Sequence, residues 1–164
     1  MIYFLALLTI LLRLLPHAPN FAPMGALALL AGMTGDQRKV WLPLAAVFAT
    51  DLILGFYPGF AWVYLSYGIL FFTGYFARKS AGIKKSFALP LAGSLFFYAV
   101  SNFGVWASSS IYPPTLSGLA QCYVAALPFF RYTAASDLLY FNGFVVLVSL
   151  LGTLVHPKPA PVRA

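Results

Sequence analysis

Seven polar side chains interrupt the apolar stretches of this sequence and are the residues best suited to chemistry. They are two guanidinium groups, two carboxylates, one imidazole and two amides: Arg13, Arg131, Asp51, Asp137, His17, Asn20 and Asn102. A charged side chain inside a membrane costs several kcal/mol unless it is paired or faces water, which makes such residues functional candidates. This mixture of donors and acceptors favours binding of a small hydrogen-bonding molecule.

The stretch from Arg13 to Met24 combines a charge, an imidazole, an amide and three prolines between two apolar runs, Ile2–Leu15 and Ala22–Thr34. As helices, each run would reach about 20 Å, short of the ~30 Å hydrocarbon core of a bilayer. Non-helical backbone at that depth is tolerated where it is buried in protein or lines a cavity. We therefore expect His17–Phe21 to form part of the wall of a site. The alternative is an ordinary loop between two tilted helices.

The composition indicates an integral membrane protein. The chain is 62% hydrophobic and 8% charged, whereas a soluble domain carries about 25% charged residues. The apolar runs are continuous rather than alternating, which predicts an all-α fold in a single transmembrane domain, residues 1–164. Met1 to Leu15 has the length of a signal peptide but lacks a basic start and a small-residue cleavage site, so we expect it to remain in the mature protein.

Six membrane-spanning helices are predicted, over Ile2–Leu15, Ala22–Thr34, Val40–Phe56, Phe60–Ala77, Phe87–Trp106 and Tyr132–Val155. With this number, eight of the ten basic residues lie on one side, which the positive-inside bias identifies as the cytoplasm. Both termini, including a tail at 156–164, are then cytoplasmic, and the location is the bacterial cytoplasmic (inner) membrane. The net charge of +7 is explained by these loops, so we expect no nucleic-acid partner.

The segment Thr115–Phe130 is apolar but interrupted by Gly118 and Pro128. As a seventh span it would place the basic tail outside, against the charge bias. We therefore predict an outer segment that covers the site as a lid or a partly inserted helix.

In this topology the polar groups gather in one outer half, which predicts a cavity that opens outward and is closed inward. The residues expected to bind its ligand are Arg13, His17, Asn20, Phe21, Asp51, Asn102, Trp106, Tyr123, Arg131 and Asp137. A second interpretation is that Arg13 and Arg131 pair with Asp51 and Asp137 as internal ion pairs, and both interpretations can hold together.

Catalysis finds no support in the sequence. It has no nucleophile elbow, no H-E-x-x-H motif and no closely spaced carboxylates. One cysteine, Cys122, and two histidines exclude an internal disulfide and a cysteine-built metal site. We expect a protein that is not an enzyme and holds no cofactor, with membrane lipid and a small molecule as its partners.

Two stretches resemble the substrate-binding S components of energy-coupling factor vitamin transporters. One is A-L-P-F-F-R-Y-T-A-A-S-D-L-L-Y, Ala126 to Tyr140, similar to the Pro-Phe, Gly-Asp and Lys pattern that opens the last helix of that family. Pro128, Phe129 and Asp137 match, while Ser136 replaces the glycine and Tyr140 the lysine. The other is G-A-L-A-L-L-A-G followed by L-P-L-A-A-V-F-A-T-D-L-I-L-G, similar to the region of the second and third helices.

The resemblance implies an S-component-like bundle of six helices, a vitamin-sized pocket near the outer face, and an energy-coupling module (a transmembrane T component with ATPases) as partner. The first helix offers only Ala6 and Thr9 where the family docks through small residues, so a solitary carrier similar to the stand-alone vitamin B12 transporters is the alternative.

Cobalamin is the ligand that this resemblance favours, with His17 or Cys122 as candidate axial ligand to cobalt. The competing function is a non-transporting structural or assembly protein whose polar groups are all internally paired.

Overall fold

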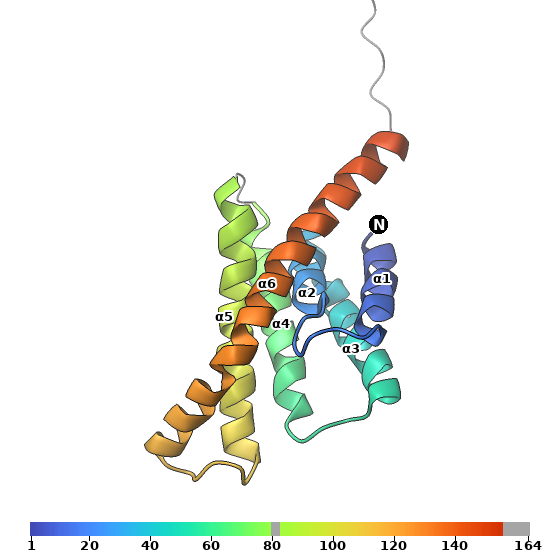
Figure 1. The fold of residues 1–164 in the computed structure, drawn as a ribbon. Coiled ribbons are helices and arrows are strands. Elements are labelled where there is room, and N and C mark those ends of the chain that lie inside the picture. Colours follow the sequence, from blue (N-terminus) through green and yellow to red (C-terminus); the bar gives the residue numbers. More distant parts are fainter. Residues whose placement is uncertain (80–82, 156–164) are drawn as a thin grey trace, which may run out of the picture.

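The computed structural model describes residues 1–79 and 83–155, so the predicted cytoplasmic tail 156–164 lies outside the described residues. Over the described ranges the chain forms helices and no strand (Figure 1). The elements in chain order are α1 (Ile2–Leu14), α2 (Met24–Met33), the 3-10 helix η1 (Gln37–Val40), α3 (Trp41–Leu54), α4 (Phe60–Ala77), α5 (Ile83–Ser108) and α6 (Leu116–Val155).

Local sequence explains where the short helices end. Leu15 is extended, with ψ of 150°, as expected for a residue before a proline, and α1 therefore stops ahead of Pro16. The turn between α3 and α4 uses Gly55 and Gly59, at φ of 93° and 84°, a conformation in which glycine carries no steric cost. At the start of η1, the Asp36 carboxylate accepts the backbone N–H of Arg38 at 3.1 Å.

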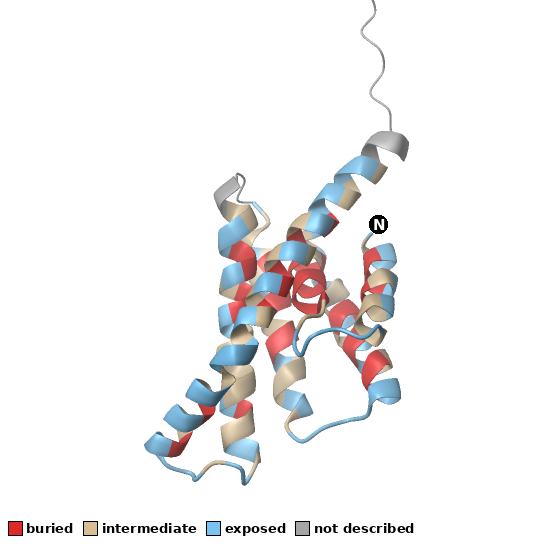
Figure 2. Cartoon of the chain, in the orientation of Figure 1, coloured by how far each residue is buried: buried red, intermediate tan, exposed pale blue. Residues whose placement is uncertain are grey.

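The core is built around α2, which packs against all five other α-helices. Most of its side chains are buried, as Figure 2 shows. Its crossing with α4 is very close. A Cβ added to Gly32 would lie 1.9 Å from the Phe71 carbonyl oxygen, and one added to Gly74 would lie 2.0 Å from the Leu29 carbonyl oxygen. Small residues thus let the two backbones touch, as in many membrane helix pairs.

Among the described residues, three helical segments are long and apolar enough to cross a membrane: Phe60–Ala77, Lys85–Ser108 and Leu116–Leu151. The helices Ile2–Leu14 and Met24–Met33 are apolar but shorter. Large apolar side chains cover the outside, with Phe76 75% and Leu139 59% exposed. The length and apolar surface of these helices indicate a membrane protein.

The α1–α2 connection lies at mid-height in the bundle, well short of the α3–α4 and α5–α6 turns (Figure 1). This position follows from helix length, since α1 has 13 residues and α2 has 10, or about 20 and 15 Å. Both helices are therefore shorter than the hydrocarbon core of a bilayer, as predicted from the sequence.

The predicted break between the outer segment Thr115–Phe130 and the last helix, Tyr132–Val155, is absent. This segment is the first part of α6, a continuous helix of 40 residues that contains Pro128. Contacts with α5 hold it in place: the Tyr123 hydroxyl donates to the Ala99 carbonyl at 2.6 Å, and the Tyr98 hydroxyl donates to the Tyr123 carbonyl at 2.6 Å. These interhelical bonds offset the backbone hydrogen bond that a helix-interior proline removes.

Candidate functional site

A cavity of about 380 Å³ lies between the α1–α2 connection and α3 to α6, within the size range of small-molecule sites. Each of these elements contributes to its wall. The lining residues are Arg13, His17, Asn20, Ala22 and Gly25 from the end of α1 to the start of α2; Leu54 and Tyr57; Val63 and Tyr67; Phe97, Tyr98, Ser101, Asn102 and Val105; and Ala126, Phe129, Phe130, Thr133 and Asp137.

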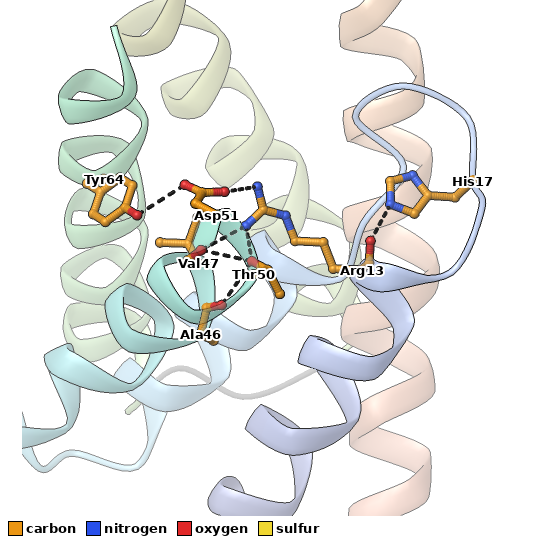
Figure 3. A network of polar contacts seen from close by, with 7 residues as sticks. All are labelled: Arg13, His17, Ala46, Val47, Thr50, Asp51 and Tyr64. Atoms are coloured by element: carbon orange, nitrogen blue, oxygen red, sulfur yellow. Dashed lines mark hydrogen bonds and ion pairs between the residues drawn. The ribbon is translucent and has the colours of Figure 1, made fainter. Parts of the chain in front are cut away.

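Arg13 reaches from the end of α1 into a network on α3 and α4 (Figure 3). Its Nη2 donates to Asp51 Oδ1 at 2.8 Å, and its Nη1 donates to the Val47 carbonyl at 3.2 Å and to the Thr50 hydroxyl. The Tyr64 hydroxyl donates to the other oxygen of Asp51 at 3.0 Å. The Asp51 side chain is 1% exposed, so its charge is balanced inside the protein by Arg13, as the ion-pair interpretation expected.

Asp137 is held at the N-terminal end of α2. The Ser94 hydroxyl on α5 donates to its Oδ2 at 2.7 Å, and the backbone N–H of Ala26 donates to the same carboxyl group. Ala26 lies in the first turn of α2, where N–H groups have no partner within the helix. The carboxylate therefore caps α2 from another helix, favourably oriented in the field of the helix dipole.

Arg131 does not pair with Asp137. Its guanidinium carbon lies 4.8 Å from the ring centroid of Tyr132, and its Nη2 donates to the Tyr132 hydroxyl at 3.1 Å. Arg131 is exposed, and it does not line the cavity. The second of the two expected ion pairs is therefore absent among the described residues.

Both ring nitrogens of His17 face carbonyl oxygens, Nδ1 that of Ala18 at 2.9 Å and Nε2 that of Arg13 at 3.1 Å. Each ring nitrogen therefore faces the backbone rather than a bound ligand. His17 is therefore engaged with backbone and is a poor metal ligand in this conformation. Its neighbour Asn20 adopts φ of 61°, a left-handed conformation that asparagine tolerates.

The structure brings five of the ten predicted residues to the cavity: Arg13, His17, Asn20, Asn102 and Asp137. The other five lie elsewhere, and Asp51 is behind Arg13. The Phe21 ring packs edge-on against Tyr140 at 5.8 Å, and the Trp106 indole N–H donates to the Pro113 carbonyl at 3.0 Å. Tyr123 and Arg131 are engaged with Ala99 and Tyr132.

The candidate cobalt ligand Cys122 is buried and lies outside the cavity lining. Its thiol is directed at the Asn102 carbonyl oxygen at 3.4 Å. Among the described residues, no group of three or more His, Cys, Asp or Glu side chains is placed to hold a metal ion.

Sequence reasoning missed the aromatic and hydroxyl lining. Tyr98 lies four residues before Asn102, and Phe130 and Thr133 lie seven and four residues before Asp137. Residues at these spacings share one face of a helix, so helical spacing from Asn102 and Asp137 was a usable signal. The resulting wall has polar groups set among aromatic rings. It is suited to holding a small molecule by hydrogen bonds and ring contacts.

Fold and cavity together define an all-helical membrane protein with a cavity lined by polar and aromatic residues. The chain belongs to a family of unknown function, DUF6580, whose family model matches residues 1–159. Neither a curated protein nor a solved structure matches the chain.

Proposed function

We propose that this protein captures a small hydrogen-bonding micronutrient at the outer face of the bacterial inner membrane for uptake. The observation that carries the proposal is the convergence of Arg13, His17, Asn20, Asn102 and Asp137 on one cavity of about 380 Å³. These residues come from three separate segments of the chain, and the aromatic rings between them provide stacking surfaces.

The proposed topology has six spans and both termini in the cytoplasm. In Figure 1 the N-terminus, the end of α4 and the start of α5 lie at one end of the bundle, and the α3–α4 and α5–α6 turns lie at the other. Arg78 and Lys79 belong to the first end. The positive-inside bias makes that end cytoplasmic. Leu54 and Tyr57 border the cavity near the opposite end, so the cavity would open outward.

The cavity supports a ligand smaller than cobalamin. The corrin macrocycle with its nucleotide loop is several times larger than a vitamin of one or two rings. Of the two candidate cobalt ligands, Cys122 is outside the lining and His17 is engaged with backbone carbonyls. We therefore favour a micronutrient well below the size of cobalamin.

The proposal of a solitary carrier is supported by the packing of α1. Its small residues Ala6 and Thr9 are 7% and 0% exposed, so they face the bundle and not a surface where an energy-coupling module would dock. Large side chains such as Leu7 and Leu11 form the outer face of α1.

The test is mass spectrometry of small molecules released when the purified protein is denatured. We expect one compound in near-stoichiometric amount from the wild type and from Gln121→Ala, an exposed amide outside the cavity lining. Asn102→Ala removes an amide of the lining and should lose the compound.

The competing function is a structural or assembly protein, favoured by the internal bonds of Asp51 and Asp137. Absence of any bound compound in all three proteins, and equal thermal stability in the presence of candidate vitamins, would support that function and contradict capture.

A further inference from the structure

The cavity lies between two groups of helices, α1 with α3 and α5 with α6, that are joined through α2 and α4. In the described part of the chain, α6 packs against α5 and α2, while α1 and α3 pack against each other and α2 and form no packed interface with α6. Figure 1 shows α6 and α3 on opposite sides of α2, with the α1–α2 connection running between them.

The α1–α2 connection fills only part of the space between α3 and α6. It contacts α6 through the Phe21 and Tyr140 rings, 5.8 Å apart, and through the Ser136 hydroxyl, which donates to the Ala22 carbonyl at 2.8 Å. Helix α1 ends at Leu14. It therefore does not extend past the α1–α2 connection to fill the space between α3 and α6. The cavity is thus bordered here by the end of α3 and the first half of α6.

Two large apolar side chains border the cavity at this place, and both are also exposed on the outside. Leu54 from α3 is 57% exposed and Phe129 from α6 is 45% exposed. Behind them lie the polar groups of Arg13 and Asp137. The exposed residues of the lining therefore include the apolar Leu54 and Phe129 as well as the polar His17 and Asn20.

Helix lengths place this opening at hydrocarbon depth in the proposed topology. Leu54 ends the 14-residue α3, about 20 Å from Trp41 at the basic end. Phe129 adjoins Phe130, whose ring lies 5.0 Å from that of Tyr98, and Tyr98 is also about 20 Å along α5 from Lys85. With a hydrocarbon core of about 30 Å, both side chains lie among acyl chains of the outer leaflet.

From this geometry we infer that the ligand is an amphiphile that resides in the bilayer and enters sideways from the outer leaflet between Leu54 and Phe129. Its hydrogen-bonding head occupies the polar interior, and its apolar tail lies between the two side chains and extends into the lipid. The head forms hydrogen bonds and is not an anion, because the cationic Arg13 is already balanced by Asp51 and the Asp137 carboxylate lines the same cavity. This inference rests on the proposed capture function and specifies its substrate class.

The test uses the full chain in lipid nanodiscs with a monoacylglycerol that carries a photoreactive diazirine in its acyl chain. This probe has a neutral hydroxyl head and one apolar tail. We expect cross-links mapped by mass spectrometry to concentrate at the ends of α3 and the first half of α6. Excess unlabelled monoacylglycerol should remove them, and glycerol, the head alone, should not.

Two matched tryptophan variants locate the opening. Ala126→Trp adds bulk on the cavity wall next to Phe129 and should abolish most of the labelling, whereas Val124→Trp, 65% exposed and outside the lining, should leave it unchanged. Labelling spread evenly over the lipid-facing surface, or equal in both variants, would overturn the sideways opening. Competition by glycerol would overturn the need for a tail. Neither of these results would contradict the proposed capture function. That function is tested separately, by the loss of a co-purifying compound from Asn102→Ala.

Discussion

The carboxylate of Asp137 occupies the space that a side chain on residue 25 would fill. A Cβ built on Gly25 would lie 2.2 Å from Asp137 Oδ1 and 2.8 Å from its Cγ. The glycine therefore lets an acid on α6 approach the first turn of α2 and accept the N–H of Ala26. Since α2 is the central helix of the bundle, this contact fixes the helix around which the cavity forms.

Gly25→Ala should destabilise the protein, because the added methyl group forces the Asp137 carboxylate away from α2. We expect a loss of about 1–3 kcal/mol, the usual cost of overpacking a tight site. The measurement is unfolding in mixed micelles followed by circular dichroism. Gly143→Ala on α6 is the control, since a Cβ there meets nothing within 4 Å. Equal stability of the two variants would contradict this account of Gly25.

The positions of most helices could be predicted from the sequence, because apolar runs between turn residues are local signals. Phe60–Ala77 was predicted with the bounds that α4 has, and α1 differs from its prediction by one residue. The continuity of α6 was not predicted. Gly118 and Pro128 are helix-breaking signals, and the hydrogen bonds from Tyr98 and Tyr123 that outweigh them join distant parts of the chain.

Half of the ten predicted site residues line the cavity, and they were predictable for a similar reason. A charge or amide in an apolar run is visible in the sequence, and this found Arg13, Asn102 and Asp137. Their partners were less visible: Asp51 was correctly paired with Arg13, but a serine and a helix N-terminus, rather than Arg131, bind Asp137. The partner of a buried acid is decided by tertiary packing.

Arg13→Met should be strongly destabilising, because it leaves the Asp51 carboxylate buried without its cation. Removing one member of a buried ion pair costs about 3–5 kcal/mol. The double variant Arg13→Met with Asp51→Leu should recover most of the loss, since both charges are then gone. Lys39→Met is the control: its nitrogen lies 3.9 Å from exposed Asp36, and such surface pairs contribute about 0–1 kcal/mol. A double variant as unstable as Arg13→Met alone would contradict the ion-pair explanation.

Thr9→Val should stabilise the protein. Thr9 Oγ1 is the only buried side-chain nitrogen or oxygen without a hydrogen-bond partner among the described residues, and an unsatisfied buried polar group costs about 1–3 kcal/mol. Valine keeps the shape of the side chain and removes the hydroxyl. Thr50→Val is the matched comparison and should destabilise, because the Thr50 hydroxyl contacts Arg13, Ala46 and Val47. The midpoint of thermal unfolding in detergent should move in opposite directions for the two variants.

Single cysteines at opposite ends of the bundle should label from opposite sides of the membrane. Cys122 is buried and is first replaced by alanine, so that Arg38→Cys and Ile111→Cys each carry one thiol. Both positions are exposed, Arg38 in η1 beside the basic end and Ile111 in the turn between α5 and α6. With six spans and cytoplasmic termini, a membrane-impermeant maleimide should label Ile111→Cys in intact cells and Arg38→Cys only after permeabilisation. This result follows from the excess of basic residues near Arg38, which the positive-inside bias retains in the cytoplasm. Labelling of both thiols in intact cells would exclude this topology and, with it, an outward opening of the cavity.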